Sequence, residues 1–338
     1  MNKLPEIIEK ISDLPVEIPF VAITGMCKNA GKTTFLNWLT ARLSQQGQVA
    51  LLTTGRDGED YDLVAGHEKP KVVIPQGSIF VTHSHILERF AGKVEILFKS
   101  DYKAGSFNIW VAKALQDLET EIVGPSTASG QIKLANQIKA YQPKFVIIDG
   151  SLDRKAITLK PEIDAMILVV SANYGTIDEI IAELKRLLLL TKIPQLALPK
   201  IENEQENLLF IKDGDIAFQL NTLLGFEKEI NAFLMDNKVD QIYLPGVLTD
   251  TIWEKVKKSF IKNSQTLIIN HPYQLHLSYD NLQRLLNQMK VYSNHKFIIS
   301  GLALNSFSIK GRHLESHLLF EAVSKITNIP IIDCMEVL

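Results

Sequence analysis

One segment near the N-terminus limits the fold more than any other. An apolar run covers residues 20–24, a loop follows from Gly25 to Gly31, and helical periodicity covers residues 33–45. A strand and a helix joined by so short a loop are typical of a parallel βαβ unit with a right-handed crossover. The chain is therefore expected to build an α/β domain around a mostly parallel sheet.

Apolar runs and helical segments keep alternating after this segment. The further strand candidates before residue 172 are residues 49–54, 72–74, 78–81, 94–98, 121–124, 144–149 and 165–171. The further helix candidates are residues 4–14, 106–118, 131–140 and 177–190. Proline and glycine within residues 75–77 predict a hairpin between two of the strands. Strands separated by helices elsewhere predict parallel βαβ units.

A polar, proline-containing stretch at residues 192–206 interrupts this alternation and marks the expected domain boundary. Before it, we expect an N-terminal helical lead at 1–18 and a P-loop nucleotide-binding domain at 19–198. After it, strand and helix candidates resume, so residues 207–338 are expected to form a C-terminal α/β lobe. The predicted fold class is α/β, with a P-loop NTPase domain built on a mostly parallel sheet and a second α/β lobe.

Composition excludes several classes of protein. The 36 Lys and Arg residues nearly balance the 38 Asp and Glu residues, without long runs of one sign, which argues against nucleic-acid or membrane-surface partners. Hydrophobic residues make up 46% and charged residues 22%, as in ordinary globular proteins. No apolar stretch approaches the roughly 18–20 residues that cross a bilayer, and the N-terminus does not read as a signal peptide. Because two cysteines build no disulfide framework, a cytoplasmic location is expected.

The glycine loop has the composition of a phosphate-binding loop. The segment GMCKNAGKTT occupies residues 25–34, and its Gly-Lys-Thr lies where a helix begins. In the strict pattern the first glycine stands five positions before the second; here Met26 has that position and Gly25 lies one earlier. A loop one residue longer can still turn its backbone N–H groups toward phosphate oxygens, supported by the helix N-terminus.

The polar residues of this loop have expected roles. Lys32 is expected to reach the terminal phosphates and act in catalysis, and the Thr33 hydroxyl is expected to bind Mg2+. Lys28 is either a second phosphate-facing cation or a solvated loop lysine. The residues expected to contact the nucleotide are Gly25, Lys28, Asn29, Ala30, Gly31, Lys32, Thr33 and Thr34.

Two acidic residues near strand ends are candidates to complete the site. Residues 145–148 are apolar and Asp149 follows them, at the carboxyl end of a buried strand, where α/β sheets bind ligands. Asp149 is therefore expected on the magnesium side, the alternative being a turn with Gly150. Asp57 lies in a glycine-rich acidic loop and is expected to polarise the attacking group or to hold Mg2+ through water. An Asp-Gly turn explains Asp57 equally well.

Several short motifs occur in an order that resembles one family. They are GMCKNAGKTT at 25–34, TGRDGE at 54–59, EKPKV at 68–72, DY at 101–102 and IDGSLDRK at 148–155. Together they look like the small P-loop subunit of the lysine 5,6-aminomutase reactivase. The glycine spacing is similar to that of dethiobiotin synthetase and the cobyric acid synthases, a branch related to the MinD-type ATPases. The likeness covers residues 20–166 and thins out afterwards.

The resemblance implies a function and partners. It implies a Mg2+-dependent ATPase that renews a cobalamin-dependent aminomutase together with a larger partner ATPase subunit; self-association is left open. The alternative is an ATP-dependent ligase similar to dethiobiotin synthetase or a cobyrinic acid amide synthase, which phosphorylates a small carboxylic acid. ATP is expected rather than GTP, since no guanine-binding Asn-Lys-x-Asp stretch follows a late strand and residues 171–174 lack it.

Overall fold

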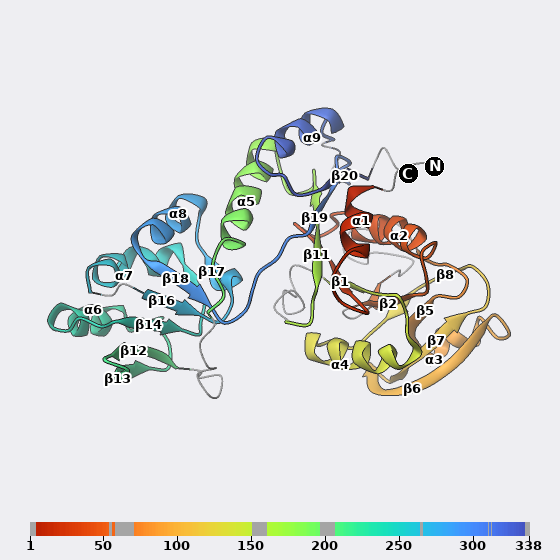
Figure 1. The fold of residues 1–338 in the computed structure, drawn as a ribbon, viewed down its shortest axis with the longest axis horizontal. Coiled ribbons are helices and arrows are strands. Elements are labelled where there is room, and N and C mark those ends of the chain that lie inside the picture. Colours follow the sequence, from red (N-terminus) through yellow and green to blue (C-terminus); the bar gives the residue numbers. More distant parts are fainter. Residues whose placement is uncertain are drawn as a thin grey trace. The chain divides into compact units, whose positions relative to one another are not determined.

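Two units, each with its own sheet, make up the chain in the computed structural model (Figure 1). The structure describes residues 5–53, 56–57, 71–150, 161–196, 207–263, 266–309, 311 and 313–334. The first unit contains Met1–Ile181 and Ile299–Leu338, and the second contains Ala182–Ile298. Both units combine helices with parallel strands, so the chain has the α/β fold class that the sequence predicts.

A nine-stranded sheet forms the first unit, in the order β20-β19-β11-β1-β10-β2-β5-β7-β6. Its strands are β1 (Phe20–Gly25), β2 (Val49–Thr53), β5 (Ile79–His83), β6 (Val94–Ala104), β7 (Phe107–Ala114), β10 (Phe145–Asp149), β11 (Ala165–Ser171), β19 (Gly301–Asn305) and β20 (Ile331–Asp333). Neighbours from β20 to β5 are parallel, whereas β7 pairs antiparallel with β5 and β6. The central strands β1, β10 and β11 are buried along their whole length, which explains their continuous apolar runs.

Helices cover both faces of the central strands. The α-helices that lie wholly within this unit are α1 (Glu6–Ser12), α2 (Lys32–Leu43), α3 (Ser84–Glu88), α4 (Ala128–Ile138) and α9 (Ser316–Ser324). Because side chains alternate along a strand, Val21 and Ile23 of β1 face one side, where they join a hydrophobic cluster with α1 and α2. Figure 1 shows α4 on the opposite side of these strands. Within the described residues, no helix of the chain is long and apolar enough to cross a membrane.

The antiparallel edge corrects two predictions. Residues 106–118, expected as a helix, contain strand β7, because Gly105 makes a turn at φ 60° and the aromatic and β-branched residues that follow favour a strand. The hairpin expected at residues 75–77 does not form. Instead, β4 (Val72–Ile74) pairs with β8 (Leu118–Thr120), and β5 pairs with β2 and β7.

A five-stranded sheet forms the second unit, in the order β13-β12-β14-β16-β18. Its strands are β12 (Leu208–Lys212), β13 (Asp215–Leu220), β14 (Gln241–Leu244), β16 (Thr266–Ile269) and β18 (Lys290–Ser293), and β15 (Leu248–Thr249) pairs separately with β17 (Leu275–His276). Strands β14, β16 and β18 are parallel, and β12 and β13 form a hairpin. The helices are α6 (Glu227–Asp236), α7 (Asp250–Asn263), α8 (Tyr279–Gln288) and the second half of α5 (Ile177–Leu190).

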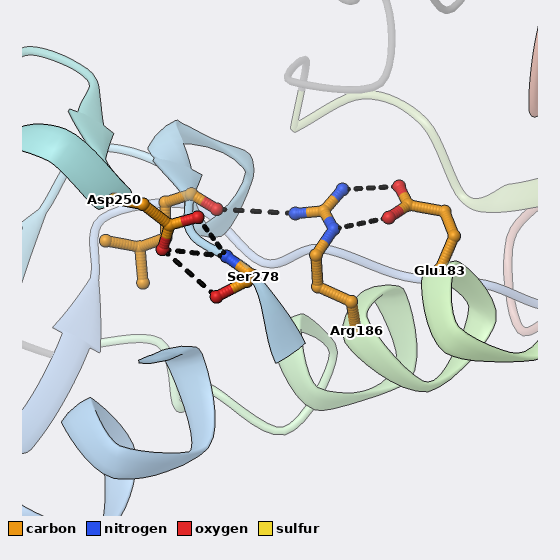
Figure 2. Close-up of polar contacts among 5 residues, drawn as sticks. Glu183, Arg186, Asp250 and Ser278 are labelled. Atoms are coloured by element: carbon orange, nitrogen blue, oxygen red, sulfur yellow. Dashed lines mark hydrogen bonds and ion pairs between the residues drawn. The ribbon is translucent and has the colours of Figure 1, made fainter. Parts of the chain in front are cut away.

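Charged side chains tie the helices of the second unit to its loops (Figure 2). Two guanidinium nitrogens of Arg186 on α5 donate to the carboxylate of Glu183, each at 2.6 Å, and a third donates to the Leu275 carbonyl at 3.4 Å. Burial acts to lower the pKa of Arg186, but the hydrogen bonds and charges of Glu183 and Tyr273 together outweigh it and raise that pKa. Asp250, which begins α7, accepts hydrogen bonds from the backbone N–H and hydroxyl of Ser278.

The division between the units differs from the predicted domain boundary. Residues 299–338 were expected in the C-terminal lobe, but β19 pairs with β11 and β20 with β19, so they belong to the first unit. Residues 182–198, expected in the P-loop domain, belong to the second unit. The apolar pattern of a strand predicts the strand but not its neighbour, because pairing between distant segments depends on the packing of the whole sheet.

Candidate functional site

The segment between β1 and α2 forms a tight loop at the end of a central strand. Two of its residues have left-handed backbone conformations, Asn29 at φ 57° and Gly31 at φ 94°. Left-handed residues in such a loop make successive N–H groups converge on one side, an arrangement that binds anions. Gly31 also precedes the first turn of α2, which contains no acidic residue. The N–H groups and the dipole of that helix end favour a negative charge in the same place.

Gly25 allows the loop to fold closely on itself. A Cβ atom at this position would lie 2.9 Å from Cβ of Ala30 and 3.2 Å from Cγ of Lys32. The side chain of Lys32 therefore begins by lying back over the start of the loop, although Lys32 is the first residue of α2. Lys32 and the next residue, Thr33, are half-buried. The loop thus combines a cationic side chain and a hydroxyl with its backbone N–H groups.

Two asparagines from other strands hold the loop backbone. Asn173 follows β11, and its Nδ2 donates to the carbonyl of Asn29 at 2.6 Å. Asn305 ends β19, and its Nδ2 donates to the carbonyl of Ala30 at 3.0 Å. These carbonyls belong to consecutive loop residues. Because both carbonyls have hydrogen-bond partners on the side of β11 and β19, neither oxygen points to the side from which an anion would approach.

Asp149 ends β10, the strand between β1 and β2. It lies in register with Ile23 of β1 and with Thr53 of β2, and it is 1% exposed. The N–H of Gly150 donates to the Ile23 carbonyl at 2.9 Å. The strand-end position predicted for Asp149 is confirmed, and it is next to the strand that leads into the loop. Its role with Mg2+ stays a prediction.

The structure describes some of the remaining site candidates. Asp57 lies in β3 (Arg56–Asp57), whose backbone pairs with β9 (Ile122–Val123). Residues 54–55, 58–70 and 151–160, which complete the acidic loop and the motif after Asp149, lie outside the described residues. Lys28 is exposed in the loop and Thr34 is half-buried in the first turn of α2. The structure therefore gathers residues 25–34 and Asp149, and the role of Asp57 stays a prediction.

Asn173 and Asn305 are the residues that sequence reasoning did not assign to the site. Each stands at the carboxyl end of a buried apolar strand, the edge at which parallel sheets bind ligands. That position is a signal, but it is useful only once β11 and β19 are known to be neighbours in the sheet that contains β1.

A magnesium site at this loop would need few protein ligands. Within the described part of the chain, no three His, Cys, Asp or Glu side chains gather as a metal-binding group. Mg2+ bound with a nucleotide takes most of its ligands from phosphate and water, so the oxygens of Thr33 and Asp149 are donors of the type it uses. Models of known protein families give no match to the chain, and comparison with curated proteins gives none either.

Proposed function

We propose that this chain is a P-loop nucleoside triphosphatase that binds Mg-ATP at the loop between β1 and α2. The observation that carries the proposal is the loop backbone, in which Asn29 and Gly31 are left-handed and two consecutive carbonyls are held by amide side chains. Such a loop presents N–H groups to an anion. A polyphosphate suits it, because the loop leads into a helix N-terminus that begins with Lys32.

The residues of the loop have distinct tasks in this proposal. Lys32 attracts and neutralises the terminal phosphates, and backbone N–H groups of residues 29–34 hold the remaining phosphate oxygens. Thr33 and Asp149 hold the magnesium ion, which when bound neutralises charge that develops on the phosphates. Asp57 polarises the attacking group or holds Mg2+ through water. Most of the catalytic effect then comes from positioned charge and N–H groups rather than from covalent chemistry.

The motifs shared with the small subunit of the lysine 5,6-aminomutase reactivase support a finer proposal. The chain would use ATP, with a larger partner ATPase, to renew a cobalamin-dependent aminomutase. Expelling a tightly held cofactor requires a conformational change, and a segment ordered by nucleotide can drive one. The loop geometry supports nucleotide binding, whereas the client enzyme is supported by the resemblance alone.

Titration calorimetry of the full chain with Mg-ATP and with Mg-GTP tests nucleotide binding directly. We expect binding of Mg-ATP and much weaker binding of Mg-GTP. If a folded chain binds neither nucleotide, the proposal is wrong. Equal affinity for both would remove the preference for ATP and leave the phosphate site standing.

Hydrolysis assays distinguish a reactivase-type ATPase from a ligase that acts on a small carboxylic acid. For a reactivase-type ATPase, slow turnover should accelerate when the partner subunit and a cobalamin-dependent aminomutase are added. Turnover that appears only with a small carboxylic acid, together with an acyl phosphate or its product, would instead support a ligase of the dethiobiotin synthetase type.

A further inference from the structure

Each of the two asparagine side chains is held in one orientation by its neighbours. Oδ1 of Asn173 accepts from the Ser308 hydroxyl at 2.8 Å and from the Ile309 N–H at 3.1 Å. Oδ1 of Asn305 accepts from the Phe307 N–H at 3.1 Å. Backbone N–H groups only donate and carbonyls only accept, so exchanging the oxygen and nitrogen of either carboxamide would break both sets of bonds. The amide nitrogens therefore point at the loop carbonyls.

The direction of a carbonyl also sets the direction of the next N–H group. In a trans peptide the C=O of one residue and the N–H of the following residue point in opposite directions, and the described chain contains no cis peptide. Holding the carbonyl of Asn29 thus orients the N–H of Ala30, and holding the carbonyl of Ala30 orients the N–H of Gly31. Both N–H groups are turned away from the asparagine side chains.

Gly31 shows how closely Asn305 fits against the loop. A Cβ atom on Gly31 would collide with Nδ2 of Asn305, and the left-handed backbone of Gly31 already disfavours a side chain. Asn173 is 8% exposed, so its amide is largely shielded from water that could replace the bond to Asn29. The loop conformation therefore depends on contacts from two strands that follow it in the sequence by more than a hundred residues.

We propose that Asn173 and Asn305 are positioning residues for the polyphosphate: without touching it, they keep the N–H groups of Ala30 and Gly31 directed at its oxygens. The inference rests on the proposed nucleotide function and adds to it two residues outside the loop. It assigns to the ends of β11 and β19 the task of preparing the loop before the nucleotide arrives.

The test compares Mg-ATP binding of full-length variants by titration calorimetry. Asn173→Ala and Asn305→Ala should each raise Kd about tenfold, because each frees one peptide unit to turn, and the double variant should raise it about a hundredfold. Asn37→Ala is the matched control. Asn37 on α2 donates to the Lys71 carbonyl and accepts from the Val73 N–H, the same two-sided pattern away from the loop, so its Kd should stay within twofold of wild type.

Aspartate variants give a readout that a purely structural role would not move. Asn305→Asp loses the donor and brings a negative charge beside the loop, so its Kd should exceed that of Asn305→Ala at pH 8. Protonation restores an O–H donor and removes the charge. The Kd of Asn305→Asp divided by the Kd of Asn305→Ala should therefore fall as the pH is lowered. Thermal melting of each nucleotide-free variant verifies that the chain is folded, and Asn305, which is half-buried, supplies a variant if Asn173→Ala unfolds.

The outcomes are distinguishable. If wild type binds Mg-ATP and the folded asparagine variants bind it equally well, the positioning role is wrong while the proposed function stands. An equal loss in Asn37→Ala would also overturn it, since the effect would then be general. If folded wild type does not bind Mg-ATP, the proposed function itself fails, and the positioning role fails with it.

Discussion

The carboxyl edges of the two sheets use polar side chains in opposite ways. In the first unit, Asn173 and Asn305 donate to backbone carbonyls of the glycine loop. In the second unit, Oδ1 of Asn270 accepts from the Tyr243 hydroxyl at 2.6 Å and from Nδ2 of Asn294 at 2.8 Å. In the first unit, the side chains bond to loop carbonyls, and the backbone N–H groups of the loop point elsewhere. In the second unit, the side chains form hydrogen bonds with one another.

The turn after β16 continues this pattern in the second unit. Nδ1 of His271 accepts from the Tyr273 N–H, and Oε1 of Gln274 accepts from the His271 N–H. Local side chains thus satisfy backbone donors of this turn. The two edges therefore differ in which backbone groups the side chains hold: carbonyls of the glycine loop in the first unit, and N–H groups of a turn in the second.

Removing the cation of the loop, Lys32, should have the largest effect on Mg-ATP binding. Lys32→Ala is expected to raise the Kd for Mg-ATP by on the order of a hundredfold or more, because the phosphates lose their closest positive charge. Lys255→Ala, which removes an exposed cation paired with Glu227 in the second unit, is the control and should bind like wild type. Calorimetry measures both. Wild-type affinity in folded Lys32→Ala would contradict the assignment of the phosphate site.

Alanine substitution of one glycine in each unit tests how much the loop depends on close backbone packing. Gly25→Ala forces the new Cβ against Ala30 and Lys32, so we expect Kd to rise roughly tenfold and stability to fall by about 1–3 kcal/mol. Gly246, just beyond β14, faces open space, and Gly246→Ala should change stability by less than about 0.5 kcal/mol. Urea unfolding and calorimetry measure the two effects. Equal effects at both glycines would show that the close packing of the loop is unimportant.

In the second unit, the stability of the fold should depend on the ion pair between Glu183 and Arg186 on α5. Arg186→Met leaves the carboxylate of Glu183 without its partner in a site where the two side chains are 11% and 19% exposed. We expect a loss of about 2 kcal/mol, which is less than for a fully buried pair because water still reaches the site. Mg-ATP affinity should not change. Double substitution with Glu183→Gln should recover part of the stability, and a single variant as stable as wild type would contradict this account.

Cys334, which follows β20 in the first unit, provides a pH-dependent test of smaller size. Burial, aided by the neighbouring Asp333 carboxylate, raises the pKa of this thiol to about 12, whereas an unfolded thiol ionises near 8.5. The folded state therefore loses stability as pH rises above about 8.5, by about 1–2 kcal/mol at pH 10. Cys334→Ala should lose less stability between pH 7 and pH 10 than wild type in urea unfolding. Identical pH dependence would contradict burial of this thiol.

The sequence predicted the central strands and several helices closely. The apolar runs at residues 144–149 and 165–171 are β10 and β11, and residues 177–190 are α5. These segments are long, continuous and bounded by turn residues, so local pattern is sufficient. Residues 106–118 contradict the prediction because their short alternation is compatible with either a helix or a strand, and pairing of β7 with β5 and β6 decides for the strand.

The sequence alone predicted that the loop exists, because its glycines, its lysine and the flanking strand and helix patterns lie close to one another in the chain. Tertiary structure alone decided what surrounds that loop. It joined β19 and β20 to the first sheet and brought Asn173 and Asn305 to the carbonyls of Asn29 and Ala30. The physical reason is that strand and helix patterns are local, whereas the order of strands depends on burying the whole sheet, to which residues far apart in the sequence contribute together.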